Sequence, residues 1–98
     1  QADRVGQHLG GGLERLIESH PRLLAESRGR GLMRALVMRQ PARAACAELW
    51  ERGVFAPFRD DIIWICPPLC IDEAGVDAVL GHFEAVLSKL GNAAARVS

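Results

Sequence analysis

The spacing of the apolar residues changes along the chain, and this change restricts the fold more than any other feature. Near both ends, apolar side chains recur every three or four residues, which is typical of an amphipathic helix. These positions are Val5, Leu9, Leu13, Leu16 and Ile17 at the start and Val76, Val79, Leu80, Phe83, Leu87 and Leu90 at the end. Between them the apolar runs are short enough for strands. A chain of 98 residues has room for one core, so helices and strands must share it.

The first helix is predicted to end before His20-Pro21. Three consecutive glycines, residues 10–12, each cost about 1 kcal/mol relative to alanine in a helix, so this helix should depend on packing against another element. An apolar run broken only by Arg34 then predicts one strand over residues 28–39. Glycines inside that strand indicate a bulge or a close approach of a backbone or a ligand.

Pro41 suits the first turn of a helix over residues 41–52, which Gly53 would close. Residues 54–58 and 62–66 are two further strand candidates, joined as a hairpin. Pro67-Pro68 ends the second of them, because proline donates no hydrogen bond to a sheet.

Asp72 is a suitable N-cap for the last helix, and Gly91 is predicted to close it. We therefore expect a domain over residues 1–91 and a loose tail over residues 92–98. The predicted fold is α+β, with a small, mostly antiparallel three-stranded sheet covered by helices in the order α-β-α-β-β-α.

The charges give no reason to expect a nucleic acid or a membrane as partner. Twelve basic residues balance twelve acidic ones, so no net field attracts polyanions. Apolar runs fall far short of the roughly 20 residues that span a bilayer, and the N-terminus lacks a signal peptide pattern, so a cytoplasmic location is expected. The odd count of cysteines, without paired short spacing, argues against a zinc site; Cys66 and Cys70 are expected to be buried and reduced.

Residues with the right chemistry for catalysis are few. Gly29-Arg30-Gly31 lacks the glycine spacing of a phosphate-binding loop and precedes a strand, so we interpret it as structural. The three histidines are expected to be solvated surface residues, and Asp60 and Asp61 to be turn formers. We therefore predict no catalytic, cofactor-binding or metal-binding residue within these 98 residues.

Three phrases in fixed order nevertheless stand out. They are Ser27-Arg28-Gly29-Arg30-Gly31-Leu32-Met33, then Glu51-Arg52-Gly53-Val54, then the run from Asp61 through Ile62-Ile63-Trp64-Ile65-Cys66-Pro67-Pro68 to Ile71. Together they resemble the C-terminal small domain of class III aminotransferases, and within that family the ornithine and acetylornithine branch. The resemblance covers nearly the whole chain, which begins with Gln1 and is expected to be part of a longer protein.

The resemblance implies a wall of a substrate cleft and points to three residues. The family commonly has an arginine at the position of Trp64, and that arginine holds a substrate carboxylate through a bidentate contact that tryptophan cannot make. Some relatives place an arginine before the proline of the preceding strand, where this chain has Ala56. Arg59 is the only nearby replacement. The substrate-cleft candidates are therefore Trp64, Arg59 and Arg28.

The resemblance also implies pyridoxal phosphate as cofactor in the full-length protein. Its chemistry needs a lysine that forms a Schiff base, which the family keeps in the large domain upstream. Lys89 is the only lysine here, and in the last turn of a helix it should face water. The implied partners are the large domain of the same chain and a second subunit. A free-standing interaction module is the alternative.

Overall fold

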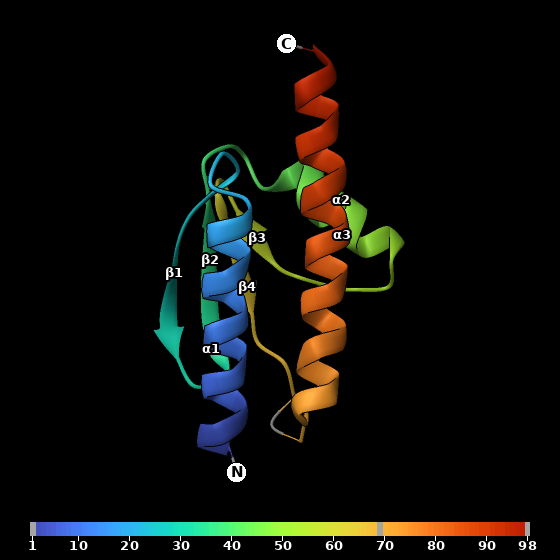
Figure 1. Cartoon of the computed structure of the whole chain (residues 1–98). Helices are drawn as coiled ribbons and strands as arrows, with labels where there is room; N and C mark the ends of the chain where they lie inside the picture. Colours follow the sequence, from blue (N-terminus) through green and yellow to red (C-terminus); the bar gives the residue numbers. More distant parts are fainter. Residues whose placement is uncertain (1, 69, 98) are drawn as a thin grey trace.

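The computed structural model describes residues 2–68 and 70–97. As the sequence predicts, a long helix lies at each end of the chain and the strands lie between them (Figure 1). In chain order they are α1 (Ala2–Ser19), β1 (Leu24–Arg30), β2 (Met33–Met38), α2 (Arg43–Glu51), β3 (Phe58–Arg59), β4 (Ile62–Ile65) and α3 (Glu73–Val97). The α+β class is confirmed, and α1 ends directly before His20 as expected.

The described strands form one antiparallel sheet in the order β1-β2-β4-β3, so there are four strands where three were predicted. The single strand predicted over residues 28–39 is wrong, because the chain reverses at Gly31-Leu32. Gly29 and Gly31 have φ values of 108° and 56°, in the left-handed region that glycine adopts without strain. These glycines make a hairpin turn, and the register shift lies earlier, between Leu24 and Glu26.

One face of the sheet and the two long helices enclose the core. Leu36 of β2 and Ile63 of β4 are at most 1% exposed, and Leu9 and Leu13 of α1 are buried with them. α1 packs along α3, and Figure 1 shows these two helices side by side against the strands. The core is mostly aliphatic, and Phe83 of α3 is its buried aromatic residue.

The glycines of α1 explain how closely this helix packs. A Cβ atom on Gly6 would lie 2.7 Å from the Cα of Gly31 in the β1–β2 turn. A Cβ on Gly12 would overlap the end of the Leu80 side chain of α3. The close packing of α1 against the β1–β2 turn therefore has a steric basis, because a larger residue at Gly6 would meet backbone atoms that cannot rotate away.

Two predicted boundaries around α2 shift. The helix begins at Arg43 and not at Pro41, and the buried Ala42 N–H donates to the carbonyl oxygen of Asp60 at 2.7 Å. Residues 54–57 are not a strand, because the Val54 N–H donates back to Leu49 at the end of α2. Only residues 58–59 pair with β4, so the predicted hairpin is present but shorter.

The predicted end of the last helix is wrong. Asp72 is its N-cap, and its Oδ1 accepts a hydrogen bond from the Gly75 N–H at 2.8 Å. The helix then continues through Gly91 to Val97, so residues 92–97 are not a loose tail. Gly91 does not have the positive φ of a C-terminal cap, and a glycine inside a helix costs only about 1 kcal/mol. Residue 98 lies outside the described residues.

Candidate substrate-wall site

The sheet register brings two of the three candidate residues into one row. Arg28 of β1 is opposite Ala35 of β2, and Ala35 is opposite Trp64 of β4. Residues directly opposite in an antiparallel ladder project from the same face, so Arg28 and Trp64 lie on one face with a small residue between them. Arg59 is opposite Ile62, two residues from Trp64, and therefore lies on this face in the next row.

This face is the one turned away from the core. Ile63 and Ile65, which flank Trp64 in sequence, are at most 5% exposed, whereas Trp64 is 37% exposed. The alternation follows directly from the two-residue period of a strand. Sequence resemblance alone grouped the three candidates, and the structure places them on one exposed surface.

The two arginines of this surface differ in their electrostatic partners. The guanidinium of Arg28 donates to Glu26 Oε2 at 2.7 Å from Nη2 and 3.2 Å from Nε, and both side chains are more than half exposed. Hydrogen bonding to Glu26, and then its negative charge, raise the pKa of Arg28. Within the described part of the chain, Arg59 has no ion pair. Arg59 is therefore the arginine better able to meet an external anion.

Trp64 also lines a pocket of about 270 Å³ where β4 ends, and we call it the Trp64 pocket. Its lining includes Val54, Phe55, Ala56, Pro67 and Phe83. The segment before β3 is held against β4 because the Trp64 N–H donates to the Pro57 carbonyl oxygen at 2.9 Å. Ala56 and Trp64, eight residues apart in sequence, thus share one pocket.

Sequence reasoning did not anticipate this pocket. The signal in the sequence that could have indicated it is Phe55, an aromatic residue two positions before Pro57, which is 73% exposed. A second hollow, about 510 Å³ between the starts of α1 and α3, is lined by Arg4, Asp72 and Glu73 and contains none of the candidate residues. In the described part of the chain no group of acidic, histidine or cysteine residues could hold a metal ion.

The residues present do not fit the anchoring of pyridoxal phosphate. Lys89 Nζ lies 2.8 Å from Glu48 Oε1 in an ion pair between α3 and α2, and the Lys89 side chain is 66% exposed. A Schiff-base lysine needs a protected site beside the reacting carbonyl. The position of Lys89 agrees with the solvent-facing role that its sequence context predicts.

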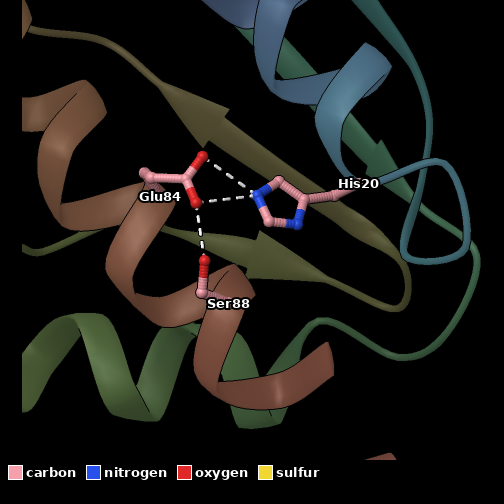
Figure 2. A network of polar contacts seen from close by, with 3 residues as sticks. All are labelled: His20, Glu84 and Ser88. Atoms are coloured by element: carbon pink, nitrogen blue, oxygen red, sulfur yellow. Dashed lines mark hydrogen bonds and ion pairs between the residues drawn. The ribbon is translucent and has the colours of Figure 1, made fainter. Parts of the chain in front are cut away.

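Two histidines that were expected on the solvated surface instead pair with carboxylates of α3, one from α1 and one from the residue directly after it. His20 Nε2 lies 3.0 Å from both carboxylate oxygens of Glu84, and its side chain is only 13% exposed (Figure 2). The Ser88 hydroxyl donates to Glu84 at 2.6 Å. His8 Nε2 lies 2.6 Å from Asp77 Oδ1, also on α3. These contacts fix the two helices together and involve none of the cleft candidates.

The exposure of the cysteines differs from the prediction. Cys66 and Cys70 are exposed, which corrects the expectation that both are buried. The prolines between them end β4 and carry the chain out of the sheet, so burial is lost there. Cys46 on α2 is buried, and its burial raises the pKa of its thiol to about 11.

Comparison with known proteins agrees with the geometry. The sequence model of the aminotransferase class-III family matches residues 1–87. An acetylornithine aminotransferase of Gloeobacter violaceus is 36% identical over 87 residues, covering 87% of this chain and 22% of that protein. A mitochondrial ornithine aminotransferase of Oryza sativa subsp. japonica is 38% identical over 94 residues, covering 89% of this chain and 20% of that protein.

Solved structures give the same result. The lysine aminotransferase of M. tuberculosis, in its internal aldimine form, superimposes with a TM-score of 0.83 at 30% identity, covering 89% of this chain and 21% of that one. A transaminase with L-ala superimposes with a TM-score of 0.85 at 28% identity, covering 94% of this chain and 24% of that one.

The fold is therefore that of a part of known aminotransferases. The chain belongs to the class-III aminotransferase family. It spans about a fifth of the length of the curated relatives it matches. None of the helices in the described residues is both long and apolar enough to cross a membrane.

Proposed function

We propose that the full-length protein is a pyridoxal-phosphate-dependent aminotransferase of the ornithine or omega-amino acid type, and that this chain is its C-terminal small domain. The observation that carries the proposal is the family match over residues 1–87. The enzyme would transfer an amino group to a 2-oxo acid. Lys89 is exposed and paired with Glu48, which supports placing the Schiff-base lysine outside these residues.

Within that enzyme, the chain would contribute a wall of the substrate cleft through Trp64, Arg59 and Arg28. Their shared face of the sheet supports this role, because one exposed surface presents all three to the same neighbour. The proposal assigns no catalytic step to the chain. It includes a large domain and a second subunit as partners, and a cytoplasmic location for the homodimer.

The test compares the 98-residue chain with the full-length protein. The full-length protein should transfer the amino group of ornithine or a related diamino acid to 2-oxoglutarate and should show the absorption band of a lysine-bound cofactor. The 98-residue chain mixed with pyridoxal phosphate should show no such stable band at stoichiometric concentration. A full-length protein without the band and without transfer would contradict the proposed function.

A free-standing interaction module is the second candidate, and one observation favours it. Trp50 and Phe55 pack edge to face with ring centroids 5.9 Å apart, and with Phe58 they line an exposed hollow of about 390 Å³. Apolar surface of this kind marks a contact with another protein surface. A gene in which an unrelated sequence precedes residue 1 would favour the module over the aminotransferase domain.

A further inference from the structure

One side of α2 is exposed although it carries a tryptophan. Side chains three, four and seven residues apart project from the same side of a helix. The exposed residues of α2 have this spacing, and we call them together the α2 face: Arg43, Ala44, Ala47, Trp50 and Glu51. The buried residues, on the other side of the helix, are Ala45, Cys46 and Leu49. That side packs against the rest of the domain, through contacts of α2 with α3 and β3.

Trp50 belongs to an apolar patch that extends beyond the helix. Its side chain is 63% exposed, and the edge-to-face neighbour Phe55 is 73% exposed. The hollow that these two rings line with Phe58 also reaches Arg43 and Ala47 of the α2 face. Single apolar residues are common on protein surfaces, whereas a contiguous apolar patch marks a contact with another molecule.

The two charges of the α2 face are at the unfavourable ends of their own helix. Arg43 is the first residue of α2 and Glu51 is the last, so a cation lies at the positive end of the helix dipole and an anion at its negative end. Neither residue has an ion pair among the residues that the structure describes. They are about 12 Å apart along the helix axis, which is too far for them to pair with each other.

We propose that the α2 face binds the α2 face of a second copy of this chain, with the two helices antiparallel about a two-fold axis near Ala47. Arg43 then lies opposite the partner's Glu51, and Trp50 lies opposite the partner's Ala44. A two-fold contact uses the same surface on both copies, so this surface must complement itself. The α2 face does so, because residues of opposite charge, and a large and a small residue, lie at equal distances in sequence on either side of Ala47.

Three further properties suit a second copy. The antiparallel arrangement brings each charge of α2 beside an opposite charge and beside the opposite helix dipole, which compensates its position in its own helix. Ala44 and Ala47 are small, and the side chains at the contact decide how closely two helices approach. The chain has a net charge of zero, so two copies do not repel each other.

The exposed aromatic area sets the strength of the contact. The exposed fractions of Trp50, Phe55 and Phe58 correspond to roughly 400 Å² of ring surface in each copy, or roughly 800 Å² in the pair. Stable interfaces bury about 1,200–2,000 Å², so the contact is a weak and reversible one. The α2 face includes none of the cleft candidates, and the inference therefore does not depend on the proposed reaction.

The experiment measures the mass of the full-length protein by sedimentation velocity between about 1 and 100 µM, the range in which weak contacts dissociate. The mass of the native particle should double reversibly as the concentration rises. Trp50→Ala should weaken this association at least about tenfold, because a tryptophan buried at the centre of an interface commonly contributes this much. Met33→Ala is the matched control, since Met33 is 70% exposed but lies on β2, and it should leave the association unchanged.

An exchange of charges tests the antiparallel pairing itself. Arg43→Glu alone, or Glu51→Arg alone, brings like charges together at both ends of the contact and should weaken association at least about tenfold. The double variant restores opposite charges in reversed order and should recover the native association. Both substitutions also suit the dipole of α2, so the double variant should fold as well as the native protein.

Three outcomes would overturn the inference: a native mass that stays constant over this range, an association that Trp50→Ala does not weaken, or a double charge variant no better than the single ones. A constant mass together with a lower Tm for Trp50→Ala would show that another part of the same chain covers the α2 face. Amino transfer, measured on the same samples, tests the proposed function separately.

Discussion

Replacing Gly6 by alanine should destabilise the domain, although the same replacement five residues further along α1, at Gly11, should stabilise it. At Gly6 the new Cβ would lie 2.7 Å from the Cα and 2.8 Å from the carbonyl carbon of Gly31. These are backbone atoms of the β1–β2 turn, which cannot rotate away as a side chain can. Either α1 or the turn must move.

The structure sets the size of the effect. Alanine gains about 1 kcal/mol over glycine in a helix. Overpacking costs about 1–3 kcal/mol. Movement of the turn would also weaken the hydrogen bonds from Arg34 to the carbonyl oxygens of Gly31 at 2.8 Å and Gly6 at 3.0 Å, each contributing about 1 kcal/mol. Gly6→Ala should therefore lower the free energy of unfolding by about 1–2 kcal/mol.

Gly11→Ala is the control within the same helix. Its Cβ would meet only Arg15 Nη1, at an ordinary 3.6 Å, so the helix-propensity gain of about 1 kcal/mol should be retained. The two variants should thus differ by about 2–3 kcal/mol, or roughly 10–20 °C in Tm for a domain of this size. Thermal unfolding followed by circular dichroism measures this difference. A Gly6→Ala variant as stable as Gly11→Ala would refute the close approach of α1 to the turn.

The remaining predictions concern the thiols and the acid stability. Cys66 and Cys70 are exposed and should react rapidly with an aromatic disulfide reagent at pH 8. Cys46 should react only on unfolding, because it is buried and burial raises the pKa of its thiol to about 11. Equal reaction rates for all three thiols would contradict this prediction. The hydrogen bond from Ser88 lowers the pKa of Glu84 below the usual carboxyl value of 4.5. This bond therefore stabilises the folded domain fully at pH values above 4.5, and the stabilisation is lost as the pH falls through the lowered pKa. Ser88→Ala should therefore make unfolding less sensitive to pH below 4.5, and an unchanged pH profile in urea titrations would argue against the bond.

The secondary structure at the two ends of the chain could be predicted because its causes are local. Apolar spacing predicted α1 and α3, His20-Pro21 marked the end of α1, and Asp72 predicted the N-cap of α3. Fixed phrases in fixed order predicted the family, and the match over residues 1–87 confirms it. These signals depend on neighbours within a few residues, so the sequence contains them in full.

The structural roles of the glycines could not be assigned without the tertiary structure. Gly29 and Gly31 are compatible with a bulge or a turn, and only the pairing of β1 with β2 decides for the turn. Gly91 is compatible with a cap or a helix interior, and α3 continues through it. In each case the residue permits several backbone conformations, and contacts between distant segments select one.

For the candidate site, too, some features could be predicted from the sequence and others depend on the tertiary structure. From residue identity alone, the family resemblance implied that Trp64 and Ala56 lie at positions where relatives have an arginine. Only the tertiary structure decided that these two residues line one apolar pocket, that Arg28 and Trp64 share a row of the sheet, and that Arg28 is paired with Glu26. The physical reason is that strand register and chain reversal, which depend on packing across the whole sheet, determine which side chains meet.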